Sequence, residues 1–186
     1  MLQLQFTPFP VLTTERLLLR QLTIKDENEI FALRTDDEVN RYLDRLKART
    51  IEDARKFISK INTGIHNNEA IYWGISLKDE PKLIGTICCW NISKENNSAE
   101  TGYELLPAYQ GKGIMQEALA KVIEYGFDIM KLHRIEAFAD ADNSRSANLL
   151  LKLHFARDMA EEKKLAGKTE YSNTMVWSLV NKNLHA

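Results

Sequence analysis

The spacing of apolar residues predicts a chain that mixes strands and helices. Residues 15–22 form an apolar run that is typical of a strand. Two Thr-x-x-Asp signals follow, at residues 23–26 and 50–53, and each is typical of the capping box that begins a helix. The first signal predicts a helix that ends near residue 34, and the second predicts another with apolar residues at helical spacing.

The middle of the chain reads as a meander of strands. Apolar runs at residues 71–77 and 83–90 flank a polar, Pro-containing turn, which predicts a β-hairpin. The polar stretch at residues 93–98 predicts the next turn, and residues 99–106 the next strand.

The last third of the chain predicts a strand at residues 133–139 and a short helix at 144–153, capped by Asp or Asn at 142–143. Two closing strands are expected near 156–162 and 174–180. We therefore expect one mixed α/β domain over residues 1–186. The order of elements does not suit a doubly wound dinucleotide-binding fold, where strands and helices alternate from the start.

The segment 107–118, PAYQGKGIMQEA, is the most informative stretch. Gly111 and Gly113 follow a strand and open an amphipathic helix, so several free backbone N–H groups and the positive end of the helix dipole meet at one spot. Glycine there lets the backbone approach an anion closely. The pattern indicates a seat for a phosphate or pyrophosphate, and a glycine turn without a ligand is the alternative. The apolar stripe of the helix comprises Ile114, Ala118, Leu119, Val122, Ile123, Tyr125 and Phe127.

Composition and charge narrow the classes of function. The 186 residues are 44% hydrophobic and 27% charged, which is ordinary for a globular protein. A net charge of −1 argues against nucleic-acid binding by general charge attraction. No stretch approaches the roughly 20 apolar residues of a membrane span, so we expect no membrane partner. Cys88 and Cys89 are adjacent and lack disulfide or metal-ligand spacing, which fits the cytoplasm.

Several blocks together resemble the GNAT superfamily of acetyl-CoA-dependent N-acetyltransferases. More narrowly, they resemble the branch that contains the ribosomal-protein N-terminal alanine and serine acetyltransferases. The blocks are TERLLLRQL at 14–22 with Asp26, AETGYELLPAYQGKG at 99–113 with Glu117 and Ala118, LHRIE at 132–136, Asp142 and Asn143 with Ser146, and Leu153 with Phe155.

The resemblance implies a single-domain fold with a central, twisted, largely antiparallel sheet, a splayed pair of parallel strands and about four flanking helices. It implies an acyltransferase that uses acetyl-CoA as co-substrate, needs no metal and acetylates a primary amine. The branch suggests the N-terminal α-amine of a protein, of the ribosomal-protein type. A small amine (a polyamine or an antibiotic) and a non-catalytic acetyl-CoA sensor remain as alternatives. Oligomeric state stays open, with a homodimer as one option.

The resemblance also assigns the cofactor contacts. Backbone N–H groups of the glycine loop would hold the pyrophosphate of CoA, and backbone groups near Leu105 and Leu106 would bind the pantetheine arm like an added strand. Asn143 would contact the pantetheine or thiol end, or else serve only as a helix N-cap. Met115 departs from the small residue usual at its place, and its bulk could crowd the phosphate. The loop positions are Gln110, Gly111, Lys112, Gly113, Ile114 and Met115.

For the chemistry, Ser146 matches the serine proposed in this branch to protonate the departing thiolate. Many GNAT enzymes use a tyrosine one helical turn later, where this chain has Leu150, so Ser146 or water remains. Glu100 is the first choice for the base and Glu104 the second, both on one strand face by the period of two. An α-amine, with a pKa of about 7.7–8.0 against about 10.4 for lysine, needs the weaker base.

Two other features bear on the site. A nucleotide-triphosphate loop is excluded because Lys112 is followed by Gly113 rather than Ser or Thr.

The family builds its acceptor pocket from the first two helices and the closing hairpin. In this chain those segments carry an acidic run at 36–38, and the run could meet a cationic amine or simply be an exposed helix end.

Overall fold

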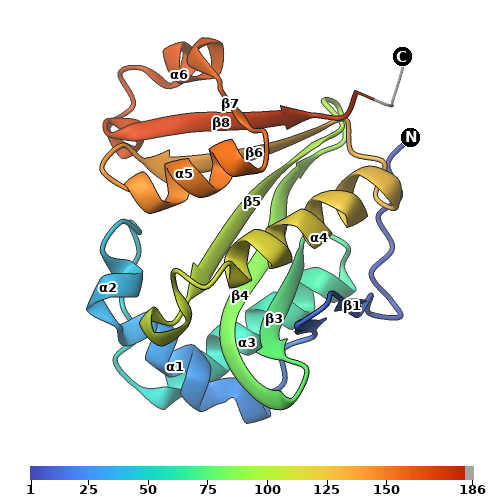
Figure 1. Cartoon of the computed structure of the whole chain (residues 1–186), viewed down its shortest axis with the longest axis vertical. Helices are drawn as coiled ribbons and strands as arrows, with labels where there is room; N and C mark the ends of the chain where they lie inside the picture. The colour runs from blue at the N-terminus through green and yellow to red at the C-terminus, as the bar shows by residue number, and fades with distance from the viewer. Residues whose placement is uncertain (183–186) are drawn as a thin grey trace.

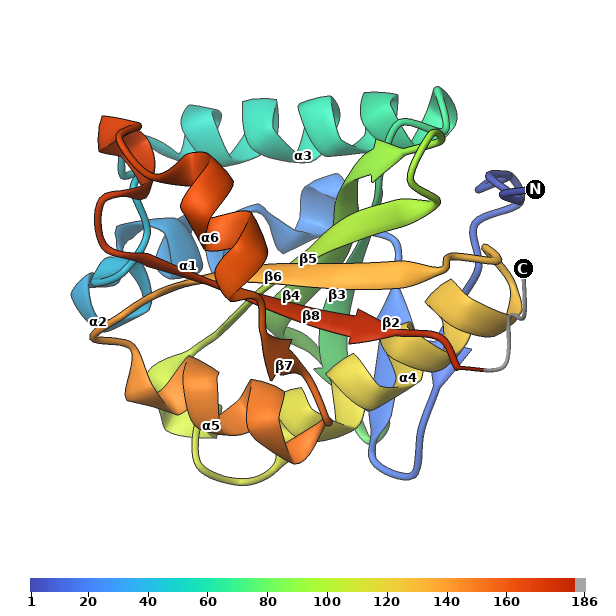
Figure 2. The ribbon, with the colours of Figure 1, turned by 90° about the horizontal axis from the view of Figure 1, so that it is seen from above.

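The fold is built on one eight-stranded mixed sheet. A computed structural model describes residues 1–182, without the side chain of Glu170. The strand order is β1-β2-β3-β4-β5-β6-β8-β7, and the only parallel pair in this sheet is β5–β6. Helices α1 and α3 cover one side of the sheet, and α4 and α5 cover the other (Figures 1 and 2). This confirms the predicted fold.

The elements have the following bounds. The strands are β1 (Leu12–Thr13), β2 (Leu17–Arg20), β3 (Ile71–Leu77), β4 (Glu80–Ser93), β5 (Ser98–Leu105), β6 (Arg134–Asp140), β7 (Ala156–Arg157) and β8 (Thr174–Val180). The α-helices are α1 (Glu27–Thr35), α2 (Asp37–Asn40), α3 (Ile51–His66), α4 (Ile114–Asp128), α5 (Ser144–Lys152) and α6 (Met159–Leu165). Three short 3₁₀ turns are η1 (Ile24–Asp26), η2 (Pro107–Tyr109) and η3 (Thr169–Tyr171).

Both predicted capping boxes are present. The Asp26 carboxylate accepts a hydrogen bond from the Thr23 N–H at 2.8 Å, and the chain then enters η1 and α1. The Asp53 carboxylate accepts one from the Thr50 N–H at 3.0 Å at the start of α3. Helices α1 and α3 pack on the sheet through a small core of Leu22, Ile30, Leu33, Ala54, Ile58 and Leu83.

The larger core lies on the opposite side, beneath α4 and α5. Trp73 of β3 is fully buried there, and its ring meets that of Tyr125 from α4 edge-on at 5.4 Å between centroids. Burial of such large side chains is the main source of stability for this layer, at about 25 cal/mol per Å² of apolar surface.

Strands β5 and β6 separate after a short parallel stretch. Their pairing ends at Glu100 with Glu136, whereas β5 continues beside β4 as far as Leu105. Strand β6 continues beside β8 as far as Asp140. The two strands therefore diverge toward the glycine loop, as Figure 1 shows, and this is the predicted splayed pair.

The tail differs from the prediction of a strand at 156–162. Only Ala156–Arg157 pairs with β8, and α6 begins two residues later. The Asp158 carboxylate caps α6 by accepting from the Glu161 N–H at 3.0 Å, and the residues after it are mostly good helix formers. The short elements β1 and α2 were also not predicted, because two to four residues carry too little periodicity.

Candidate active site

The glycine loop at the start of α4 has the backbone geometry expected of an anion-binding turn. Gly111 and Gly113 have φ of 74° and 75°, in the left-handed region that favours glycine, and Gly113 is the N-cap of α4. No atom lies within 4 Å of the place where a Cβ on Gly111 would stand. The first N–H groups of a helix have no intrahelical acceptor, so this open loop fits the pyrophosphate of CoA.

Glu117 anchors this loop to the start of the chain. Its carboxylate accepts hydrogen bonds from Thr14 Oγ1 at 2.5 Å, from the Arg16 N–H at 2.9 Å and from Arg16 Nε at 2.7 Å. Arg16 Nη1 also donates to the Lys112 carbonyl at 3.1 Å. Burial acts to raise the pKa of Glu117, but the hydrogen bonds from Thr14 and Arg16 outweigh it and lower that pKa.

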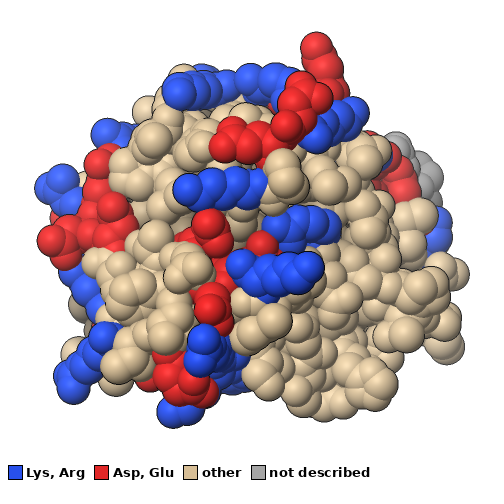
Figure 3. All heavy atoms as spheres, turned by 90° about the horizontal axis from the view of Figure 1, so that it is seen from below, with Lys and Arg blue, Asp and Glu red and all other residues tan. Residues whose placement is uncertain are grey.

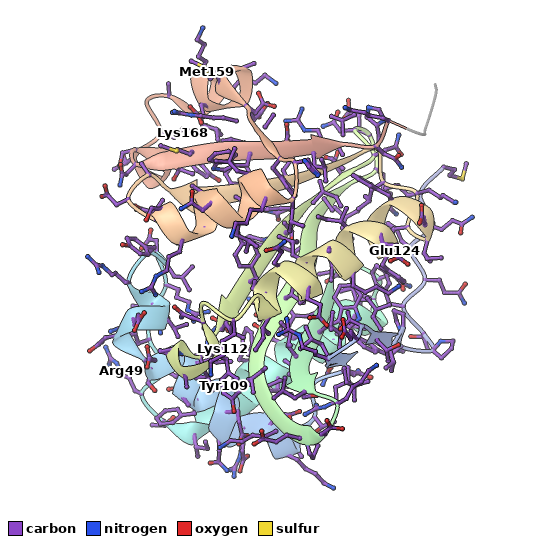
Figure 4. The ribbon with its side chains drawn as sticks, viewed as in Figure 1. Arg49, Tyr109, Lys112, Glu124, Met159 and Lys168 are labelled. Atoms are coloured by element: carbon purple, nitrogen blue, oxygen red, sulfur yellow. The ribbon has the colours of Figure 1, made fainter. Side chains whose placement is uncertain are left out.

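The side chains of the loop point in different directions. Ile114 and Met115 are buried in the larger core, so the bulk of Met115 is turned away from the seat and only its backbone faces it. Lys112 lies beside Tyr109 on the exposed loop below α4, with its Nζ 5.8 Å from the ring centroid (Figure 4).

Gln110 joins the loop to β5 and α5. Its Nε2 donates to the Leu105 carbonyl at 2.9 Å, and its Oε1 accepts from Arg145 Nη1 at 2.6 Å. The Leu106 N–H is committed to the Ile84 carbonyl of β4 at 2.9 Å. Because hydrogen-bonding direction alternates along an antiparallel pair, the backbone N–H of Leu105 faces the gap between β5 and β6. Of the two predicted leucines, only Leu105 thus presents its N–H to the gap.

Asn143 and Ser146 lie in the first turn of α5. Asn143 Oδ1 accepts from the Ser146 N–H at 3.1 Å, so Asn143 is the helix N-cap. The Ser146 hydroxyl lies 2.7 Å from the hydroxyl of Tyr103 on β5. Burial raises the pKa of Tyr103 to about 12, against the opposing effect of the Ser146 hydrogen bond. Leu150 is fully buried and packs in the core.

Tyr103 was not among the predicted site residues. Its position two residues before Leu105 places both on the same face of β5, the face that carries α5. The sequence predicts that Tyr103 and Leu105 share a strand face, but it does not predict the contact between Tyr103 and Ser146.

Glu100 and Glu104 lie on the other face of β5, which α1 and α3 cover. The Glu104 carboxylate is 5% exposed, accepts from Arg45 Nη2 at 2.6 Å and from Thr86 Oγ1 at 3.2 Å. Glu100 accepts from Asn91 Nδ2 at 2.9 Å. Burial raises the pKa of Glu100, and the charge of Glu136 adds to this, against the hydrogen bond from Asn91.

The candidate acid, Ser146, and the candidate base, Glu100, therefore lie on opposite sides of β5. Ser146 and Tyr103 lie on the side of α5, whereas Glu100 lies on the side of α1 and α3. The backbone pairing of β5 with β6 ends at Glu100, so the gap between the two strands begins between these two sides.

The acidic residues near the expected acceptor side are mostly engaged. Asp36 caps α2, Asp37 pairs with Lys47, and Glu38 pairs with Arg145. In α6, Glu161 pairs with Lys164, and Glu162 pairs with Arg157. The acidic run thus serves as a helix cap and as ion-pair partners. Seen from below, Lys and Arg are interspersed with Asp and Glu on the surface, without a large patch of one sign on that face (Figure 3).

The two cysteines are free and buried. Burial raises the pKa of Cys89 to about 12, and raises that of Cys88 further, so neither thiol is activated as a nucleophile. Within residues 1–182, no group of three or more His, Cys, Asp or Glu side chains is placed to hold a metal ion. No helix in that part of the chain is long and apolar enough to cross a membrane.

Comparison with known proteins agrees with this geometry. Residues 16–156 match the family model of the acetyltransferase (GNAT) domain. The chain is 36% identical to the uncharacterized N-acetyltransferase YoaA of Bacillus subtilis, over 92% of this chain and 97% of that protein. It is 30% identical to the ribosomal protein uS5-alanine N-acetyltransferase of Escherichia coli, over 79% of this chain and 78% of that protein. The solved ribosomal-protein-S5-alanine acetyltransferase of Vibrio fischeri superposes with a TM-score of 0.75 at 25% identity, covering 95% of this chain and 100% of that one.

Proposed function

Because the chain belongs to the GNAT family and is an acetyl-CoA-dependent N-acetyltransferase, we propose that it acetylates the N-terminal α-amine of a protein. The main observation behind the proposal is the arrangement at β5, where the strand separates from β6. Glu100 lies on one side of β5, and Ser146 with Tyr103 lies on the other. The names of the uS5-alanine acetyltransferase relatives support a ribosomal protein as the acceptor.

In the proposed mechanism, the loop at 110–115 holds the pyrophosphate of acetyl-CoA, and the Leu105 backbone binds the pantetheine arm in the gap. Asn143 fixes the first turn of α5 and so the direction of Ser146. Free N–H groups of β5 hold the carbonyl oxygen of the thioester as its negative charge develops. No cysteine takes part, so the amine attacks the thioester directly.

Proton transfer completes the step. Glu100 receives a proton from the incoming ammonium through a water molecule, since burial raises the pKa of this carboxylate and so makes it a stronger base than an exposed glutamate. The amine nitrogen then bonds to the acetyl carbon, and the carbon–sulfur bond breaks. Ser146 gives its proton to the departing thiolate and regains one, through water, from the nitrogen of the new amide, and the hydrogen bond with Tyr103 holds the serine in place. Glu104 is bound by Arg45 and Thr86 and is the second candidate.

A matched set of acceptors tests the proposal. One peptide has a free α-amine, a second is N-terminally blocked but contains lysine, and the others are a polyamine and an aminoglycoside. Release of the CoA thiol and the mass of each product are measured. We expect turnover with the free α-amine peptide. Turnover only with a small amine would support that alternative, and calorimetric acetyl-CoA binding without turnover of any amine would support a sensor.

We also infer that the protein works in the cytoplasm. Two buried free cysteines fit a reducing compartment, in which thiols are not driven to pair. That the protein forms a homodimer, and that residues 1–186 are one acetyltransferase domain, stay predictions.

A further inference from the structure

Two arginines and one carboxylate meet on the α1–α3 side of the sheet. Arg45 Nη2 lies 2.6 Å from Glu104 Oε2, and Thr86 Oγ1 donates to the other oxygen of Glu104. The Tyr72 hydroxyl is 3.1 Å from Thr86 Oγ1, and the Tyr72 ring packs edge-on against Phe57 at 5.7 Å. Arg34 lies over the Phe57 ring with its Cζ 4.2 Å from the centroid.

The charges of this cluster do not balance. Arg45 neutralises Glu104, whereas the Arg34 side chain has no ion pair or hydrogen bond with any described residue. Arg34 is partly buried. Burial lowers its pKa, and the charge of Arg45 lowers it further, although Glu104 and Tyr72 act in the opposite direction. The Arg34 guanidinium packs on the Phe57 ring, and its N–H groups have no acceptor among the described residues, so they are available to an added anion.

The cluster borders the place where the acceptor must arrive. Glu104 directly precedes Leu105, whose N–H faces the gap, and it shares a strand face with Glu100. Glu104 and Glu100 are four residues apart, about 13 Å along β5. The cluster therefore lies beside the Leu105 end of the gap, where the proposed site holds the thioester that the amine attacks.

We propose that Arg34, supported by Arg45, forms a subsite for a carboxylate carried by the acceptor amine. The acceptor is then an amine with a carboxylate a few bonds away, supplied by an acidic side chain near the N-terminus of a peptide or by the α-carboxylate of a free amino acid. The inference rests on the proposed acetylation of an amine and adds the class of acceptor.

The test compares isosteric acceptors that differ only in charge. Two peptides carry Asp or Asn at the second position, and a free amino acid is compared with its amide. For the source that fits, we expect kcat/KM to favour the carboxylate roughly 10- to 100-fold, the usual effect of a hydrogen bond to a charged group. The preference should shrink as salt is added.

Variants identify the residue responsible. Arg34→Gln should reduce the ratio of the two kcat/KM values to about 1, and Arg34→Lys should retain part of it. Arg55→Gln is the matched control, because Arg55 lies on α3 and pairs with Glu27 on the exposed surface. It should leave the ratio unchanged. The melting temperature and the acetyl-CoA Kd of each variant show whether its fold is intact.

Several results would overturn the inference. Equal kcat/KM for Asp and Asn peptides, together with equal values for the amino acid and its amide, would do so. A preference for the carboxylate that survives Arg34→Gln would also overturn it. If Arg34→Gln does not fold, the inference is overturned when Arg34→Lys keeps the full wild-type preference at every salt concentration. If no amine is acetylated, the proposed function fails instead. The inference then stands only if the Asp peptide binds more tightly than the Asn peptide by fluorescence anisotropy.

Discussion

The hydroxyl groups of Tyr103 and Ser146 lie 2.7 Å apart, although the two residues are 43 positions apart in the chain. Tyr103 comes from β5 and Ser146 from the first turn of α5, so the contact joins these two elements beside the place where β5 and β6 diverge. A serine hydroxyl held in this way has one fixed partner and can direct its own proton to a second atom. In the proposed mechanism, this pair takes the role of the tyrosine that many GNAT enzymes carry at the position of Leu150, which is buried here.

Ser146→Ala should lower kcat by roughly 10²-fold or more, the usual range for a general acid, and leave the Kd of acetyl-CoA within about two-fold. Tyr103→Phe should cost less, because it removes only the group that positions Ser146. The double variant should be no slower than Ser146→Ala, since the two hydroxyls act as one unit. Rates are measured by thiol release and binding by calorimetry. An undiminished rate in Ser146→Ala would assign the protonation to water.

Gly111→Ala and Gly113→Ala should each destabilise the fold by about 1–2 kcal/mol, because alanine is strained at a φ near +75°. The Kd of acetyl-CoA should rise roughly tenfold if relief of this strain turns the N–H groups of the loop away from the phosphate. Gly64→Ala is the matched control. It lies inside α3 with no atom closer than 3.9 Å to the new Cβ, so it should stabilise by about 0.5–1 kcal/mol. Chemical denaturation and calorimetry measure both quantities, and equal effects at all three glycines would contradict the left-handed requirement.

Glu117→Gln should cost about 1 kcal/mol of stability near neutral pH, because it loses the charge that Arg16 pairs with at a partly exposed site. The pKa of Glu117 is lowered in the folded protein, so its contribution is present above the ordinary glutamate pKa. The difference between wild type and variant should close as pH falls through the lowered pKa. Urea unfolding across pH measures this. Glu124→Gln, at an exposed pair with Lys121 on the same helix, should change stability by less than about 0.5 kcal/mol.

Glu100→Gln should lower kcat by roughly 10²-fold if Glu100 is the base. Because burial raises the pKa of Glu100, kcat/KM of the wild type should begin to fall at a pH above the ordinary glutamate pKa of about 4.3 as the solution is acidified. The same raised pKa means that the ionised form destabilises the fold, so wild type should lose stability as pH rises through that pKa, and the variant should not. If Glu104→Gln abolishes the fall of kcat/KM on acidification and Glu100→Gln keeps it, Glu104 is the base and Glu100 is not.

Local signals were enough to predict most of the fold. The capping boxes at Thr23 and Thr50, the turn between β3 and β4, and the glycines before α4 each depend on residues a few positions apart. Such signals fail where a short segment has competing propensities. A strand was predicted near residues 156–162, but the helix formers of residues 159–165 and the Asp158 cap make α6 instead.

The sequence by itself therefore determined the order of the longer elements, the glycine turn that begins α4 and, through the resemblance, the family. Only the tertiary structure decided which side chains meet: Ser146 with Tyr103, Glu117 with Thr14 and Arg16, and Glu104 with Arg45. These pairs are separated by 43 to 103 residues. Their contacts depend on strand register and on which face of the sheet each helix covers, and no local periodicity encodes either of these.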